Sequence, residues 1–496
     1  MKESLYESLK AYGDSDFYPF HMPGHKRNAR SGPLSEWYKC DITEIDGFDN
    51  LHQPEGILLD AQNRAAKLFG SEETYFLVNG STAGILSAIS AVAVKGRKLV
   101  MARNCHKAVY HAAFLNRLEP EYVYPSVIDE YGLADGITTE QIRKCLKDLA
   151  SKESVADEQL KDIVAGIVLT SPTYDGILSD VEGIVKLAHE YEIPVIVDQA
   201  HGAHFGFHDA FPVSSVAHGA DFVIQSVHKT LPAPTQTAIL HCNGNLADRA
   251  LLKRYLQIYQ TSSPSYLLMA GMDACMKILQ QEGKERLQQL ITYRKLFFEK
   301  TKELQHIKIY PSMLEKEKQT DAVWEPGTAE PGRLVISLYK SNLTGRELYD
   351  RLREKYHLQM EMCGANYVVA ILSMMDEWEG LERLAKALKE IDTELSEKEK
   401  AGELFGESIT PTKLLSLADA FTAESEEVIL EDAIGRAVSD FINLYPPGIP
   451  LLAPGECLDN KIYVVIKGYL ENNYVVQGIN NDLVSGEVTI KVVKRG

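Results

Sequence analysis

The sequence lacks several features that would place it in a specialised class of protein. Its 496 residues contain no apolar run of about 18 or more, so no transmembrane helix is expected. The first residues, MKESLYESLKAYG, are polar and lack the apolar stretch of a secretory signal peptide. The seven cysteines are odd in number and include no CxxC pair, which argues against a disulfide framework or a zinc site. These absences predict a cytoplasmic protein with reduced thiols.

Positive charge is also scarce. The chain has 52 Lys and Arg against 70 Asp and Glu, a formal net charge of −18. This balance argues against nucleic acid as a partner, which needs a basic face for phosphates, and against docking on an anionic membrane. It leaves room for a small cationic ligand. Hydrophobic content of 45% is ordinary for a globular protein, and the length predicts about three domains.

Short apolar segments alternate with helical segments through the first half of the chain. Because the strands are apolar on both faces, they predict a parallel-rich sheet covered on both sides, a doubly wound α/β domain. The predicted strands are 74–79, 98–102, 121–125, 162–170, 194–198 and 221–226. The predicted helices are 57–69, 80–94, 106–116 and 181–192.

The pattern divides the chain into an arm and three further units. Residues 1–55 read as a short helix and an irregular arm, and 56–290 as the large α/β domain. Residues 291–395 predict a small α+β domain, and 409–496 a C-terminal α+β domain with a Pro-rich loop. Strands are expected at 333–339, 367–374, 462–470 and 487–493.

Polar side chains follow several predicted strands, at the edge where ligands bind in open α/β sheets. Ser81 and Thr82 open a helix, which suits a phosphate because backbone N–H groups and the helix dipole point toward an anion. The same residues suit an ordinary turn with a capping hydroxyl. His106 suits ring stacking or helix capping, and Thr173 suits a cofactor contact or the turn in which it lies.

Two charged residues end or follow buried strands, where a charge is costly unless it is paired or functional. Asp198 ends one strand, and His201 follows three residues later. Lys229 follows the next strand, where burial would lower its pKa and make its amine nucleophilic. A loop cap and a surface lysine are the ordinary alternatives. His201 and His204 lack the i, i+4 helical spacing of a zinc motif, so no metal site is predicted.

The set of residues, taken in order along one sheet, matches the needs of pyridoxal phosphate (PLP). The phosphate needs N–H groups and hydroxyls, the pyridine nitrogen needs a carboxylate, and the aldehyde needs a lysine. The same segments resemble the prokaryotic Orn/Lys/Arg decarboxylases, in the short form without the N-terminal wing domain. The motifs that carry the resemblance are HMPGHKR (21–27), LVNGSTAG (77–84), RNCHKA (103–108), SPTYDG (171–176), DQAHGAH (198–204), SVHKTLPAPTQ (226–236) and YPPGIPLLAPGE (445–456).

The resemblance implies a PLP-dependent transferase-like fold (fold type I) and a decarboxylase of arginine, lysine or ornithine that yields a polyamine or its precursor. It implies that Lys229 forms the Schiff base, Asp198 pairs with the pyridine nitrogen and His106 stacks on the ring. His201 would lie near the ring oxygen or the substrate carboxylate, and Lys229 or His228 would protonate Cα. The implied phosphate ligands are Ser81, Thr82, Ser226 and His228, with Thr173 as a further cofactor contact.

The resemblance also implies at least a homodimer, with segment 17–55 as the candidate to cross the interface. The chain departs from the family pattern at Cys105 and at Gln199, where glutamate is usual, and Pro232 and Pro234 stiffen the loop after Lys229.

Other readings stay open from the sequence. One is another fold-type I reaction, such as aminotransfer, aldol cleavage or another lyase reaction. An aminotransferase would need an arginine for the substrate carboxylate. Arg333 is the candidate, although an exposed arginine at a strand start is the expected interpretation. A non-catalytic PLP-fold protein is the third reading. The distal group of a basic substrate has two candidate partners, Glu361 and Glu456, both expected to be exposed.

Overall fold

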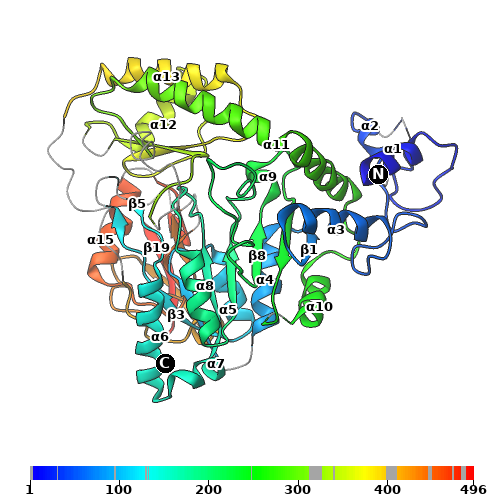
Figure 1. Ribbon diagram of the computed structural model, residues 1–496. Helices are drawn as coiled ribbons and strands as arrows, with labels where there is room; N and C mark the ends of the chain where they lie inside the picture. The colour runs from blue at the N-terminus through cyan, green and yellow to red at the C-terminus, as the bar shows by residue number, and fades with distance from the viewer. Residues whose placement is uncertain are drawn as a thin grey trace.

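The computed structural model describes residues 4–28, 30, 32–93, 97–128, 131, 133–246, 248–311, 327–338, 341–397, 410–444, 449–471, 474–481 and 487–495. Figure 1 shows a central α/β domain with the small domain at one end and the C-terminal domain beside it. The N-terminal arm projects from one side of the molecule, and helix α15 (Asn460–Glu471) of the C-terminal domain lies on the other.

The large domain is built on a seven-stranded sheet in the order β1-β9-β8-β7-β6-β2-β3. Neighbours from β8 to β3 are parallel, as predicted, whereas β9 runs antiparallel between β1 and β8. Strand β9 was not among the predicted strands, and β3 lies two residues earlier than expected. The strands are β1 (Glu73–Leu77), β2 (Lys98–Ala102), β3 (Glu119–Val123), β6 (Val164–Thr170), β7 (Val195–Asp198), β8 (Phe222–Gln225) and β9 (Ala238–Cys242).

Helices cover both faces of this sheet, which confirms the doubly wound prediction. Successive residues of a strand point to opposite faces, so Val168 joins the core under α4, α5 and α10, while Leu169 joins the core under α6 and α8. The helices of this domain are α3 (Ile57–Phe69), α4 (Gly80–Val92), α5 (Lys107–Leu115), α6 (Thr139–Glu153), α7 (Leu160–Ile163), α8 (Val181–Glu190), α9 (Val227–Thr230) and α10 (Arg249–Tyr259). A hairpin of β4 (Val127–Ile128) and β5 (Leu133–Ala134) and a 3-10 turn (Asp157–Gln159) complete it.

The N-terminal helix α1 (Leu5–Gly13) is held by a capping box and by the long helix α11 (Tyr266–Thr301). Ser4 and Glu7 exchange capping hydrogen bonds, and the backbone N–H of Leu5 donates to Asp273 of α11 at 2.9 Å. Leu5 and Leu9 are fully buried in the same core. The arm that follows contains the short helix α2 (Ser35–Tyr38).

The small domain is an antiparallel sheet in the order β10-β11-β13-β12. Helix α11 leads into it without a break, so the expected boundary at 290 lies within this helix. The elements are β10 (Lys308–Tyr310), β11 (Arg333–Ser337), α12 (Gly345–Glu354), β12 (Met362–Cys363), β13 (Tyr367–Ile371) and α13 (Trp378–Asp392). Residue 339 of the predicted strand 333–339 lies outside the described residues.

The C-terminal domain corrects one prediction. Segment 462–470, expected to be a strand, lies in helix α15 (Asn460–Glu471). Its β-branched residues favour a strand, but Ile462 and Ile466 are both buried at i, i+4 spacing, which suits one face of a helix. The strand expected at 487–493 is confirmed as β19. The other elements are α14 (Leu417–Thr422), β14 (Ser425–Ile429), β15 (Ile442–Leu444), β16 (Ile449–Leu452), β17 (Val476–Gln477), β18 (Ile479–Asn481) and β19 (Val488–Val493). They form the sheets β14-β19-β18 and β16-β15-β17.

A buried ion pair joins the C-terminal domain to the large domain. Arg103, just after β2, donates to Glu456 at 2.9 Å and to the carbonyl of Pro450 at 2.8 Å. Glu456 is only 2% exposed, which corrects the expectation of a surface glutamate. It also accepts from the backbone N–H of Ala453 at 2.8 Å. Of the Pro-rich loop 445–456, residues 445–448 lie outside the described residues.

Removing one partner of this pair should destabilise the fold more than removing both. We expect Arg103→Met to lower the free energy of unfolding by about 3–5 kcal/mol, because Glu456 would be left as an uncompensated buried charge. The double variant Arg103→Met/Glu456→Leu should recover most of that loss. Urea unfolding measures both, with Lys186→Met in the exposed Lys186–Glu182 pair as the control. Equal losses in the single and double variants would contradict the interpretation.

Candidate active site

The candidate residues gather at one edge of the large-domain sheet. Asp198 is the last residue of β7, Ser226 follows β8 directly, and Lys229 lies on the single turn α9 that comes next. Ser81 lies in the first turn of α4 after β1, and His106 caps α5 after β2. Strand β9 runs antiparallel to both β1 and β8, so β1 has the same direction as the parallel strands of the sheet. The carboxyl ends of all these strands therefore meet at this edge.

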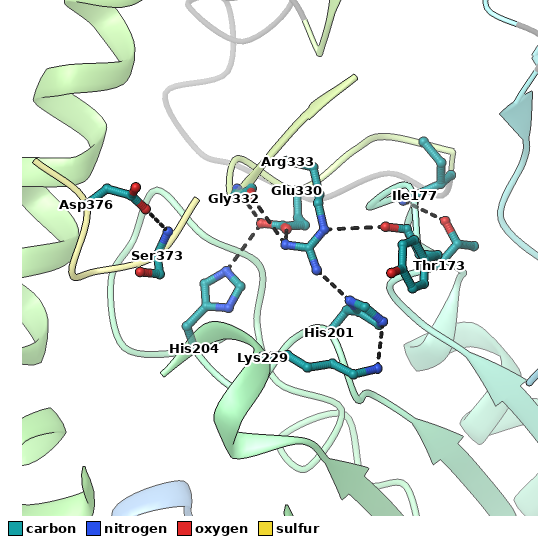
Figure 2. Close-up of polar contacts among 11 residues, drawn as sticks. Thr173, Ile177, His201, His204, Lys229, Glu330, Gly332, Arg333, Ser373 and Asp376 are labelled. Carbon is teal, nitrogen blue, oxygen red and sulfur yellow. Dashed lines mark hydrogen bonds and ion pairs between the residues drawn. The ribbon is translucent and has the colours of Figure 1, made fainter. Parts of the chain in front are cut away.

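A chain of hydrogen bonds runs from Lys229 into the small domain (Figure 2). Lys229 Nζ lies 2.9 Å from His201 Nε2, and His201 Nδ1 lies 2.7 Å from a guanidinium nitrogen of Arg333. Arg333 forms an ion pair with Glu330 at 3.2 Å, and Glu330 lies 3.2 Å from His204 Nε2. Arg333 and Glu330 are fully buried. The site therefore contains a charged pair that water does not reach.

Arg333 overturns the expectation of an exposed arginine at a strand start. It is the largest fully buried side chain of the described residues, and its guanidinium is held by Glu330, His201 and the carbonyl of Tyr174. An aminotransferase would use the N–H groups of such an arginine to bind the substrate carboxylate, and here those N–H groups donate to protein partners. Neither Glu330 nor His204 was a predicted site residue. Glu330 lies three positions before Arg333, the first residue of β11, but its other partner, His204, is 126 positions away, so the sequence around Glu330 does not show that the two meet.

The electrostatics of Lys229 and Asp198 follow from burial. Burial lowers the pKa of Lys229, and Arg333 lowers it further, while Asp198 and Glu361 act in the opposite direction. Burial raises the pKa of Asp198, against the charge of Lys229. Asp198 is 4% exposed, accepts from the backbone N–H of Ala200 at 3.2 Å, and has no ion-pair partner within 4.0 Å among the described residues. A buried carboxylate of this kind suits an incoming cationic group.

The hydroxyls of Ser81 and Ser226 lie 2.6 Å apart, although 145 positions separate them in the sequence. The side chain of Asn79, the capping residue of α4, makes no hydrogen bond to the first turn, so the N–H groups there are available to an anion. Thr82 is exposed in the same turn. His228 donates from Nδ1 to the carbonyl of Thr237 at 2.8 Å, so only a doubly protonated ring would also donate from Nε2 to a phosphate. This cluster of hydroxyls and N–H groups fits a phosphate.

The side chains of His106 and Thr173 each accept a hydrogen bond from a nearby backbone N–H group. His106 Nδ1 accepts from the backbone N–H of Ala108 at 3.2 Å, and burial, assisted by Lys229, lowers the pKa of His106 to about 4. It is therefore a neutral ring at neutral pH. Thr173 Oγ1 accepts from the backbone N–H of Ile177 at 3.0 Å.

Of the two glutamates proposed for a distal group, only Glu361 lies near the site. It is exposed just before β12, accepts a hydrogen bond from the Tyr174 hydroxyl, and raises the pKa of Lys229 through its charge. Glu456 instead belongs to the buried pair with Arg103.

Comparison with solved structures defines the class of the fold. The Francisella novicida lysine decarboxylase LdcF superposes with a TM-score of 0.84 at 19% identity, covering 99% of this chain and 81% of that one. Serine palmitoyltransferase of Sphingomonas wittichii superposes with a TM-score of 0.52 at 14% identity, over 70% of this chain and 81% of that one. The chain thus has the fold of the fold-type I PLP-dependent enzymes, as predicted.

Sequence comparison identifies the family. Residues 3–379 match the major domain of the Orn/Lys/Arg decarboxylases, and residues 402–489 match their C-terminal domain. Arginine decarboxylase of Bacillus subtilis is 31% identical over 482 residues, which cover 96% of this chain and 95% of that protein. The chain belongs to the Orn/Lys/Arg decarboxylase family, which confirms the predicted class, a decarboxylase of basic amino acids. No helix in the described part of the chain is both long and apolar enough to span a bilayer.

Proposed function

We propose that this chain is a PLP-dependent decarboxylase that acts on arginine. The observation that carries the proposal is the meeting of Lys229, Asp198 and the Ser81–Ser226 hydroxyl pair at one edge of the sheet. Support for arginine comes from the relatives. Arginine decarboxylases of Bacillus subtilis and Bacillus anthracis are 31% and 30% identical, against 23% for the constitutive lysine decarboxylase of Escherichia coli.

The residues present fit PLP. The hydroxyls of Ser81, Thr82 and Ser226, with His228, would hold the phosphate, and Asp198 would face the pyridine nitrogen. The neutral ring of His106 would stack on the cofactor, with Thr173 as a further contact. Lys229 would attach to the cofactor aldehyde. Bound PLP supplies an electron sink for breaking the bond between Cα and the carboxylate.

The protein groups then have separate tasks in the reaction. The partly buried surroundings of Lys229 would favour neutral CO₂ over a carboxylate. Lys229 or His228 would deliver the proton to Cα, since both residues lie beside the proposed cofactor site and each can carry a proton on a side-chain nitrogen. His201 lies between Lys229 and Arg333, where its Nε2 would meet the ring oxygen or the substrate carboxylate.

The distal guanidinium of the substrate would be recognised by Glu361, which is exposed and close enough to Lys229 to shift its pKa. The Tyr174 hydroxyl bonds one carboxylate oxygen and orients it. A carboxylate can bind a guanidinium through two parallel hydrogen bonds, which gives geometric selectivity as well as charge.

We further propose a homodimer in which the N-terminal arm contacts the partner. Phe17, Tyr18, Phe20 and Met22 are 64–90% exposed in the arm, and an exposed apolar cluster of this kind indicates an interaction surface. The seven cysteines, none in a disulfide, support a reducing compartment such as the cytoplasm.

Lys229→Ala should abolish covalent attachment of PLP and nearly all turnover, by about a thousandfold or more, because no other amine replaces the nucleophile. The visible absorbance of the purified protein and CO₂ release measure the two effects. Lys186→Ala, an exposed lysine on α8, is the matched control and should behave as wild type. Turnover retained in the Lys229 variant would refute the assignment.

Arginine should be decarboxylated faster than lysine and ornithine when the three are compared side by side by CO₂ release. Glu361→Gln should raise the KM for arginine by about tenfold or more while changing kcat less, because it removes the charge that meets the guanidinium. Glu354→Gln, an exposed glutamate on α12, is the control. Release of a keto acid instead of CO₂ would contradict decarboxylation, and an unchanged KM would exclude Glu361.

The full chain should sediment as a dimer of about twice 55.4 kDa. Phe20→Ser/Met22→Ser should weaken the dimer by about tenfold or more, through lost burial of apolar surface. Ile258→Ser, at a position that is 67% exposed on α10, is the matched control. A monomer at every concentration would overturn the dimer.

A further inference from the structure

The hydrogen bonds around His201 can be satisfied in only one way. Arginine has N–H donors and no acceptor, so the contact of 2.7 Å from Arg333 requires a lone pair on His201 Nδ1. A histidine without a proton on Nδ1 is neutral and carries its proton on Nε2. That N–H then points at Lys229 Nζ, 2.9 Å away (Figure 2). The contact is a hydrogen bond only if Lys229 Nζ accepts it, and an ammonium group cannot.

We propose that Arg333 is a positioning residue that fixes His201 as the tautomer protonated on Nε2, and that His201 thereby holds the Lys229 amine in its neutral, accepting form. The inference deepens the proposed function, because a neutral amine is the nucleophilic form of lysine and the form that captures an aldehyde. The basic side chains of Lys229, His201 and Arg333 lie in a row, and in this arrangement only Arg333 carries a positive charge.

Glu330 and His204 complete the arrangement on the far side of Arg333. Both carboxylate oxygens of Glu330 are used, one by Arg333 at 3.2 Å and the other by His204 and the backbone N–H of Gly332. Because a fully buried guanidinium is stable only beside a compensating charge, Glu330 keeps Arg333 charged and in place. Burial lowers the pKa of His201 well below its ordinary value, and the charge of Arg333 acts in the same direction, in agreement with a neutral ring.

The tautomer is read from ¹⁵N NMR of the cofactor-free full chain labelled at histidine, with the His201 signal assigned by its loss in His201→Gln. In the wild-type protein, His201 should show a protonated Nε2 and an unprotonated Nδ1. Arg333→Met should lose this single form, because its side chain donates no hydrogen bond, whereas Arg333→Lys, which still donates, should retain it. Arg64→Met, at an ion-paired arginine of α3 outside the network, is the control.

A merely structural role for Arg333 would lower the unfolding temperature but leave the tautomer of the folded protein unchanged, and that result would overturn the proposal. A wild-type His201 protonated on Nδ1 would overturn it as well. Neutron diffraction from wild-type crystals locates the same protons, so the test stands even where Arg333→Met fails to fold.

The rate at which the cofactor-free chain captures PLP gives a second readout that does not depend on turnover. His201→Gln places an amide near the Nε2 position and can still donate to Lys229, whereas His201→Asn reaches only as far as Nδ1. The Gln variant should capture PLP faster than the Asn variant, and the reverse order would contradict the proposal. A chain with the expected tautomer that decarboxylates none of the three amino acids would overturn the proposed function and leave this inference standing.

Discussion

The site depends on one fully buried ion pair, Arg333 with Glu330, which stands where the small domain meets the carboxyl edge of the large-domain sheet. A buried pair adds little to stability, because desolvation offsets most of the attraction, but its partners cannot separate without leaving a bare charge in the interior. Arg333 begins β11 of the small domain and contacts His201 of the large domain. The orientation of the histidine beside Lys229 is thereby tied to the docking of the small domain.

A second buried ion pair joins the C-terminal domain directly to the large domain. Arg103 precedes the capping His106 by three residues and bonds Glu456 and the carbonyls of Pro450 and Leu451. Each peripheral domain is thus joined to a loop at the carboxyl edge of the sheet through a buried arginine and a glutamate. Such pairs are selective in geometry, because a guanidinium offers its donors in a fixed fork. A displacement of either domain would move a loop of the proposed cofactor site.

The net charge of −18 is consistent with a cationic substrate, and the structure shows where one part of that charge lies. Glu361 is exposed and lies close to Lys229, whereas Glu330 and Glu456 form ion pairs with buried arginines. Other acidic residues form exposed pairs with lysine or arginine, such as Glu182 with Lys186, and these pairs contribute little energy. In the proposed reaction, the charge balance would therefore act through one carboxylate, Glu361, rather than through the overall count of charges.

The sequence by itself determined the family, the doubly wound sheet and the positions of Asp198, Ser226 and Lys229, because strand ends and apolar alternation are local properties. Local patterns did not reveal β9, and the β-branched composition of 462–470 indicated a strand where buried Ile462 and Ile466 lie on one face of a helix. Only the tertiary structure decided which charges are buried. Glu456 was expected at the surface because Arg103, which compensates its charge, belongs to another domain. Arg333 was expected at the surface because its contact with His201 forms only where the domains pack, although its ion-pair partner Glu330 is three positions away. His201 and Arg333 are 132 positions apart, and a contact across that separation leaves no trace in the residues on either side.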